Sequence, residues 1–245
     1  MHSQRGCEHV DKVDKPKRFY KQAAAAPAGS GYSVQLDGRP IKTPAKATLT
    51  LPTAALADAV ASEWAGQGEM LDLQAMTLTR LANVAIDRTP DTRADLADEL
   101  TRYASTDVTC YLADAPTELR ERQDAAWRPW RDWAGQELGI VLVPVIGLMA
   151  SPQPPASLEA VRAHALKLDD YRLTALTWAC SLLGSAVLAL AVERGALTAP
   201  DALNASIVDE DWQIEQWGQD EEAMQVREAR AKDAAALQLW FEALS

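Results

Sequence analysis

The strongest constraint on the fold is a change of hydrophobic period at Pro52. Before it, residues 31–36 alternate apolar and polar side chains as a β-strand does, and Asp37-Gly38 supplies a tight turn before a returning strand. After it, apolar residues recur every three or four positions, which is the spacing of amphipathic helices. The sequence therefore predicts an α+β fold, with a small β-rich N-terminal domain followed by a larger all-helical C-terminal domain.

The predicted organisation has three parts: a flexible N-terminal lead over residues 1–16, a β-rich domain over 17–75 and a helical domain over 76–245. In the β-rich part, the alanines at 23–26 have helical propensity, but the proline and glycines that follow favour a loop after them. In the helical part, three prolines within residues 151–155 form a turn that no helix can cross.

Several residues are expected to set the ends of the helices. Thr53 can cap the first helix, Asp91 can cap the third, and Pro116 can open the fourth. Pro129 falls inside that fourth helix and is expected to bend it. The last helix is expected to run from about residue 221 to residue 244.

The uncharged stretch from Leu173 to Val192 is twenty residues long and could span a membrane. Its alanines, small polar residues and lack of flanking aromatic or basic clusters favour a buried helix or a helical hairpin instead. A membrane-associated scaffold remains one hypothesis that depends on this stretch. We expect no membrane insertion.

The charge balance narrows the classes of partner. The 245 residues carry a formal net charge of −11, although residues 1–50 are basic, with nine Lys and Arg against four Asp and Glu. A nucleic-acid partner is not expected, because no basic stripe interleaved with aromatic residues is present. Cys7, Cys110 and Cys180 are widely spaced and include no C-x-x-C pair, which favours a reducing compartment.

The sequence contains none of the common motifs for phosphate, dinucleotide, hydrolase or zinc-protease chemistry. His2, Cys7 and His9 could ligate a metal, but no fourth ligand accompanies them, so we expect neither a metal nor a cofactor. His164, the only other histidine, is more typical of a structural or exposed position than of a general base. The chain is not expected to be an enzyme.

An enzymatic alternative rests on carboxylates. Asp87, Asp107 and Glu210 each lie near a turn or helix end beside apolar residues, and two of them could meet as acid and base. Nothing in the spacing shows that they meet. Local capping and salt bridging are the preferred interpretation, and a small-molecule enzyme with paired carboxylates remains the alternative function.

A tryptophan-bearing acidic segment lies near the C-terminus. Between Asp201 and Glu222 the chain has eight acidic residues and no basic one. Carboxylates without cations are costly to bury, whereas an aromatic anchor in a negative field suits a protein interface. The alternative is a helix with a solvated acidic face and one indole packed inward. The candidate contact residues are Asp209, Glu210, Trp212, Gln213, Glu215 and Trp217.

Many short phrases in one order give the chain a family resemblance from about residue 17 to the C-terminus. They are Lys17-Arg18-Phe19-Tyr20-Lys21, residues 36–44, Glu63-Trp64 with Gln67, residues 76–81, Ala85-Ile86-Asp87, Tyr103 with Thr106-Asp107, Cys110-Tyr111, Gln123 with Trp127 and Pro129, Gly184-Ser185, Glu210, Trp212-Gln213 and Trp217-Gly218. The chain resembles the assembly chaperones for the F1 sector of ATP synthase, specifically the member that holds the α subunit.

This resemblance implies a non-enzymatic chaperone, expected as a monomer, that shields the interface of the unassembled α subunit and releases it for assembly of the hexamer. The family occurs in the mitochondrial matrix and in bacteria; the apparent lack of a presequence and the alanine-rich composition favour the bacterial cytoplasm. Six further residues match family phrases, and for them we favour interior ion pairing and packing between helices over partner contact. They are Glu63, Trp64, Arg80, Asp87, Asp107 and Trp127.

Overall fold

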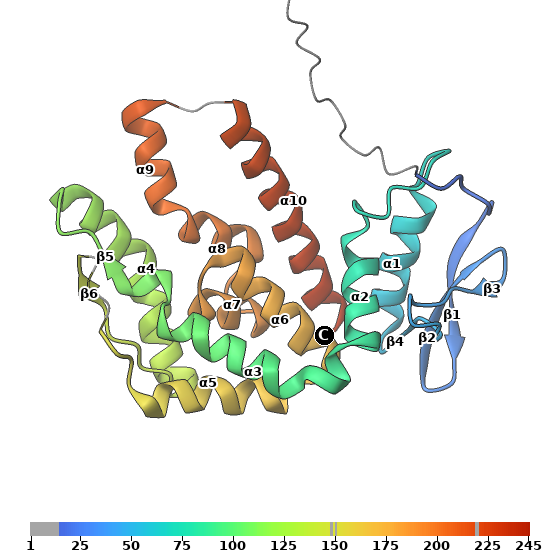
Figure 1. Cartoon of the computed structure of the whole chain (residues 1–245), viewed down its shortest axis with the longest axis horizontal. Coiled ribbons are helices and arrows are strands. Elements are labelled where there is room, and N and C mark those ends of the chain that lie inside the picture. Colours follow the sequence, from blue (N-terminus) through green and yellow to red (C-terminus); the bar gives the residue numbers. More distant parts are fainter. Residues whose placement is uncertain (1–14, 148, 150, 219–220) are drawn as a thin grey trace, which may run out of the picture.

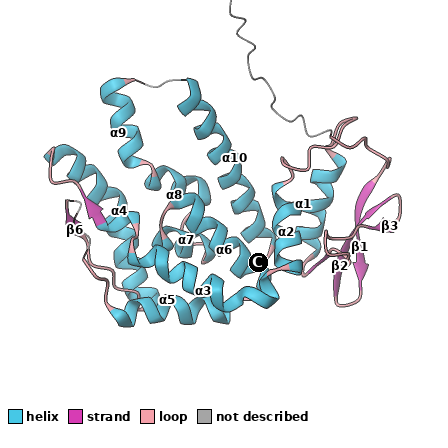
Figure 2. Ribbon diagram, in the orientation of Figure 1, coloured by secondary structure: helices cyan, strands magenta, loops and turns pink. Residues whose placement is uncertain are grey.

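The computed structural model describes residues 15–147, 149, 151–218 and 221–245. A small sheet lies at one end and mostly helices form the rest of the molecule, so the predicted α+β fold is confirmed (Figures 1 and 2). The C-terminal part is not all-helical as predicted, because β5 and β6 pair there as a short parallel sheet. The strands are β1 (Ala23–Ala28), β2 (Gly31–Leu36), β3 (Arg39–Pro40), β4 (Thr50–Leu51), β5 (Tyr111–Leu112) and β6 (Val145–Ile146). The predicted division at residues 17–75 and 76–245 stays a prediction, and all but the last two residues of the predicted lead lie outside the described residues.

The helices follow one another closely after the sheet. They are α1 (Ala54–Ala65), α2 (Thr77–Asp87), α3 (Thr89–Ser105), the short 3-10 turn η1 (Val108–Cys110), α4 (Thr117–Leu138), α5 (Pro155–Lys167), α6 (Asp170–Leu183), α7 (Ala186–Glu193), α8 (Ala199–Ser206), α9 (Val208–Trp217) and α10 (Glu221–Ala243).

The N-terminal sheet is antiparallel and is centred on β2, which pairs with β1, β3 and β4. The Asp37-Gly38 turn is where the spacing predicts it, and Asp37 accepts backbone hydrogen bonds from Lys21 and Gln22. Residues 23–26 are neither helix nor loop, because they form β1 and their backbone groups pair with β2. Pairing with a neighbouring strand here outweighs the helical propensity of alanine.

The predicted helix ends are partly confirmed. Thr53 caps α1 by accepting a hydrogen bond from the Leu56 backbone N–H at 3.1 Å. The prediction for Asp91 is wrong: α3 already begins at Thr89, so Asp91 lies in the first helical turn, where its charge still favours the helix dipole. Helix α4 continues through Pro129.

The uncharged stretch forms a buried helical hairpin, as one of the sequence interpretations expects. Gly184 ends α6 with a φ of 63°, and the Ser185 side chain caps α7 by accepting from the Leu188 N–H. Every residue of α7 is buried against other helices. Within the described part of the chain, no helix is long and apolar enough to cross a membrane.

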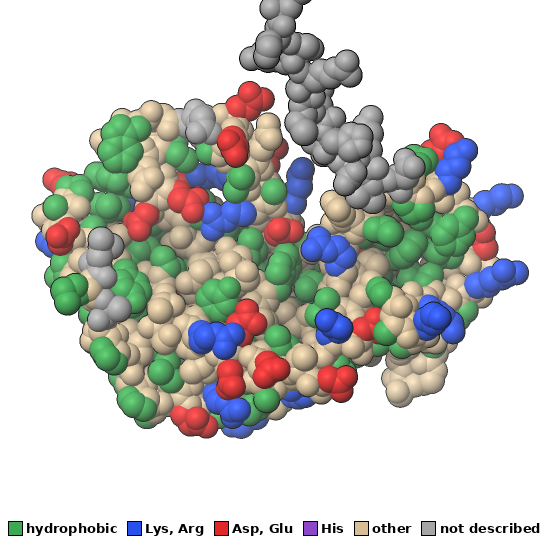
Figure 3. All heavy atoms as spheres, viewed as in Figure 1, with side chains coloured by type: hydrophobic (Ala, Val, Ile, Leu, Met, Phe, Trp, Pro, Cys, Tyr) green, Lys and Arg blue, Asp and Glu red, His purple; other side chains and the backbone are tan. Residues whose placement is uncertain are grey.

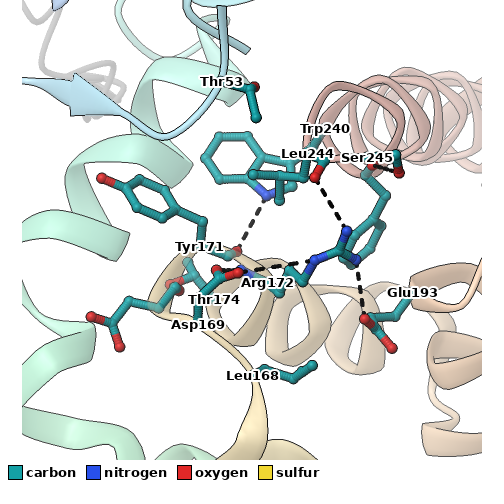
Figure 4. A network of polar contacts seen from close by, with 12 residues as sticks. Thr53, Leu168, Asp169, Tyr171, Arg172, Thr174, Glu193, Trp240, Leu244 and Ser245 are labelled. Atoms are coloured by element: carbon teal, nitrogen blue, oxygen red, sulfur yellow. Dashed lines mark hydrogen bonds and ion pairs between the residues drawn. The ribbon is translucent and has the colours of Figure 1, made fainter. Parts of the chain in front are cut away.

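A polar network fixes the C-terminal half of α10 against the sheet side of the molecule (Figure 4). The Tyr171 hydroxyl donates to the Thr50 carbonyl at 2.6 Å, and the buried Trp240 indole donates to the Tyr171 carbonyl at 3.2 Å. Arg172 binds Glu193 at 3.2 Å and the Leu244 carbonyl at 3.3 Å. We call this region, residues 234–244 with their partners on α6 and around β4, the junction.

Candidate functional site

The acidic tryptophan segment forms α9, which stands with the N-terminal half of α10 above the rest of the helices (Figure 1). We call α9 together with residues 221–231 of α10 the arm. Val208 is the one fully buried residue that α9 contributes. The Trp217 side chain is 78% exposed, so Trp217 is not the inward-packed indole of the alternative interpretation. Trp212 is half-buried, and the Arg122 guanidinium lies 5.2 Å from the centroid of its ring.

The carboxylates of α9 have partners, contrary to the expectation that they are uncompensated. Glu210 binds Arg230 at 2.8 Å and Asp211 binds Arg227, both on α10. These arginines follow the acidic segment in sequence and face it only because the two helices pack as a pair. Sequence spacing therefore hides them.

Helix α4 supplies the other two partners of α9. Glu215 binds Arg122 at 2.7 Å, and this hydrogen bond lowers the pKa of the Glu215 carboxyl. Asp209 accepts a 2.6 Å hydrogen bond from the Gln123 amide, whose oxygen accepts from the backbone N–H of Ala113. The arm is thus held to the body mainly by polar contacts.

A groove of about 590 Å³ lies between α9 and α10. Its apolar walls include Ile214, Trp217 and Val226, while Glu210 and Gln213 lie among its polar residues. Acidic and basic side chains lie side by side over the arm on the face shown in Figure 3. The groove therefore combines exposed apolar surface with balanced charge, as protein-recognition surfaces do.

The groove continues along the molecule as two further hollows. A middle hollow shares Glu210 and Arg230 with the arm, and it shares Trp178, Ser181 and Asp233 with a hollow among α2, α3, α6 and α10. We call the three hollows together the long groove. Arg80 lies at its far end. Arg80 is one of the six family-matching residues for which we favour interior packing, and the long groove connects it with the arm.

Glu63 and Trp64 lie at the end of α1 and serve the packing of their neighbours. The Glu63 carboxylate accepts from the backbone N–H groups of Leu78 and Thr79, each at 2.8 Å, and so caps the start of α2. Burial raises the pKa of Glu63, and these hydrogen bonds oppose the shift. Trp64 packs edge-on against Tyr20, and its buried indole N–H has no hydrogen-bond partner among the described residues.

Asp107 is fully buried where η1 meets the break between α6 and α7. Its carboxylate accepts hydrogen bonds from Thr109, Ser185 and the Val187 backbone N–H, at 2.7 to 3.0 Å. Burial raises the pKa of Asp107, while those donors lower it. Trp127 is also buried, and its indole donates to the Ala205 carbonyl at 2.7 Å. Both residues hold helices together, as the interior interpretation expects.

The carboxylates of the enzymatic alternative are served by separate donors. Asp87 accepts from the Ala45 backbone N–H at 2.9 Å, Asp107 is closed to solvent, and Glu210 binds Arg230 on the arm. A paired acid and base therefore has no geometric support.

Other candidate groups are also committed to the fold. His164 lies 3.1 Å from the buried Glu193. Cys110 and Cys180 are free and buried, and burial raises the pKa of the Cys110 thiol to about 12. No group of three metal-ligating side chains occurs among the residues that the structure covers, and the predicted cluster of His2, Cys7 and His9 lies outside them.

Comparison with known proteins gives one consistent result. Residues 17–135 match the family described as ATP12 chaperone protein. The mitochondrial protein atp12 of Schizosaccharomyces pombe is 25% identical over 232 residues, which cover 90% of this chain and 80% of that protein. The crystal structure of Atp12 from Paracoccus denitrificans is 42% identical, has a TM-score of 0.82 and matches over 92% of this chain and 95% of that one.

A putative chaperone from Agrobacterium tumefaciens is 37% identical, with a TM-score of 0.89 over 97% of this chain and 93% of that one. The shared sequence and fold define the class as an assembly chaperone of F1 ATP synthase. The chain belongs to the ATP12 chaperone family.

Proposed function

We propose that this chaperone binds the unassembled α subunit of F1 ATP synthase, shields its assembly interface and releases it when the hexamer forms. An unassembled subunit of a ring exposes apolar surface that tends to aggregate. A holder must cover that surface without binding so tightly that the later partner cannot replace it. Membership of the ATP12 family supports the role in assembly, and the long groove supports direct binding.

The single observation that carries the proposal is the build of the arm. The exposed Trp217 offers an aromatic anchor beside the apolar wall that Ile214 and Val226 form. Glu210 and Gln213 lie at the same groove, where Glu210 can exchange Arg230 for a cationic group on the α subunit and Gln213 can offer its amide. Trp212, Asp209 and Glu215 then act one step away, by fixing α9 to α4.

The proposal also covers the oligomeric state, the location and the ligands. The chaperone works as a monomer in the bacterial cytoplasm, with neither a cofactor nor nucleic acid. The two bacterial structures that it resembles support this location, and a mitochondrial relative supports the same role in the matrix. The groove lies open rather than enclosing a small substrate, which favours a macromolecular partner over the enzymatic alternative.

Co-expression with the α subunit alone tests the proposal. We expect the α subunit to stay soluble and to co-purify with this chain. Glu210→Lys places a second cation beside Arg230 in the groove and is expected to reduce capture about tenfold, with little change in the melting temperature.

Glu228→Lys is the matched control, because the Glu228 side chain is exposed on α10, does not line the groove and forms no hydrogen bond or ion pair with a described residue. Equal capture by the two variants would show that Glu210 is not at the contact. Failure of the wild-type chain to capture the α subunit would reject the function itself.

A further inference from the structure

The far end of the long groove is a hollow of about 310 Å³ where α2, α3, α6 and α10 meet. Its apolar lining consists of Leu81, Val84, Leu96 and Trp178, which come from three different helices. A hollow of this size and lining can hold one long side chain with an aliphatic stem.

Two carboxylates in this hollow lack partners. Glu99 on α3 and Asp233 on α10 line it, and neither side chain forms a hydrogen bond or an ion pair with a described residue. The carboxylates of α9, in contrast, are all paired with arginines or an amide: Asp209, Glu210, Asp211 and Glu215. Partial burial raises the pKa of Asp233, since it disfavours the charged form of this carboxyl.

Arg80 is not an ion-pair partner for either of these carboxylates. It lines the hollow, but its guanidinium donates to the Gln74 carbonyl at 3.0 Å and forms no ion pair with either carboxylate. Its field lowers the pKa of Asp233 less than burial raises it. Glu99, Asp233 and Arg80 together give the lining a formal charge of −1, so one further cation would make it neutral.

We infer that this hollow is a binding pocket for an arginine side chain of the partner protein. A guanidinium can reach carboxylates on opposite walls with separate N–H groups and can stack on the Trp178 ring. Its methylene stem would cover Leu81, Val84 and Leu96. The identity of the partner rests on the proposed function, but binding of the side chain does not.

Argininamide is the probe, and the readout is the indole N–H cross-peak of Trp178 in a proton–nitrogen NMR spectrum, assigned with a Trp178→Phe variant. We expect a saturable shift with about millimolar affinity, as for a fragment of this size. Citrullinamide has the same shape without the charge and should bind at least tenfold more weakly. Absence of a saturable shift, or equal binding of the two probes, would overturn the inference.

Two variants test whether argininamide binds at the two carboxylates of this hollow. Glu99→Gln and Asp233→Asn should each weaken argininamide binding about fivefold to tenfold, whereas Glu228→Gln should bind as the wild-type chain does. The backbone spectrum reports whether each variant is folded, and using two separate carboxylates guards against the loss of one variant. Unchanged affinity in both variants would contradict the inference.

The α subunit then tests whether the partner uses the pocket. The double variant Glu99→Gln, Asp233→Asn should capture the α subunit at least tenfold more weakly than Glu228→Gln does. Undiminished capture would separate the pocket from the chaperone contact and overturn its assignment to this partner. If even the wild-type chain captures no α subunit, the proposed function fails while the argininamide titration still decides the pocket.

Discussion

The two halves of α10 do different work within one helix. In the junction, Leu237, Trp240 and Phe241 are almost fully buried in the core that also contains Leu51 of the sheet. In the arm, residues 221–226 are all exposed, and contacts with α9 depend on arginine–carboxylate pairs. One helix is therefore held by buried apolar side chains in its C-terminal half and by exposed ion pairs in its N-terminal half.

The two halves of α10 contribute unequally to the stability of this chaperone. Burying a large apolar side chain contributes about 1.5–3 kcal/mol, while exposed ion pairs contribute little and are screened by salt. Contacts of the second kind are easily exchanged for contacts with a partner. We conclude that the junction maintains the fold and that the arm is free to rearrange when a partner binds.

The largest expected effect is on the junction. Trp240→Ala removes a fully buried indole and its hydrogen bond to the Tyr171 carbonyl, so the free energy of unfolding should fall by about 3–5 kcal/mol. Trp217→Ala removes an exposed indole and should change it by less than about 0.5 kcal/mol. Denaturant unfolding of both variants measures the two changes in unfolding free energy. Similar losses in the two variants would contradict a difference between junction and arm.

Recognition should show the opposite ranking. Trp217→Ala is expected to weaken capture of the α subunit at least tenfold, because an aromatic anchor at an interface is a typical binding hot spot. Leu239→Ala is the control, since Leu239 is 44% exposed on the junction half of the same helix. Pull-down at graded α subunit concentrations gives the affinities. If Leu239→Ala weakens capture as much, the partner contacts the junction as well.

A smaller effect is expected from salt. Raising the ionic strength from about 0.1 M to about 1 M shortens the Debye length from about 10 Å to about 3 Å and weakens the exposed pairs of the arm. Hydrogen exchange should accelerate in residues 208–217 and 221–231, while residues 234–243 keep their protection. Uniform acceleration along α10 would contradict an arm held by exposed ion pairs.

The smallest expected effect is a response to acid of opposite sign in two regions. The hydrogen bond from Arg122 lowers the pKa of Glu215 below its ordinary 4.5. The Arg122–Glu215 pair therefore contributes to stability above pH 4.5, and this contribution is lost as the pH falls through the lowered pKa. Protection factors for residues 208–217 should therefore decrease in that window.

Asp107 responds in the other direction, because burial raises its pKa above the ordinary 3.8. Between the ordinary pKa of the unfolded state and the raised pKa of the folded state, the folded protein binds more protons than the unfolded one. Protonation of Asp107 therefore adds stability as the pH falls through this range. Asp107→Asn should remove this acid-linked gain, measured as the pH dependence of unfolding free energy. An unchanged dependence would show that Asp107 does not titrate in this range.

Local signals predict much of the fold but little of the charge pairing. The Thr53 cap and the Asp37-Gly38 turn depend on neighbours a few residues away, so periodicity and capping chemistry find them. Strand β1 is not predicted, because its stability comes from pairing with β2 rather than from its alanines.

The site is predicted in outline only. The acidic tryptophan segment and the family resemblance together give six candidate contact residues, and three of them, Glu210, Gln213 and Trp217, line one groove. Arg122 and Arg230 are missed because they reach α9 from 93 and 20 residues away. The Glu99–Asp233 hollow is missed for the same reason, since four helices must pack before its walls exist.

Hydrogen exchange of the chaperone with and without the unassembled α subunit tests the central claim most directly. The arm, residues 208–217 and 221–231, should gain protection on binding, while residues 234–243 of the junction should stay as they are. Protection that appears on the sheet or the junction while the arm exchanges as before would contradict the claim.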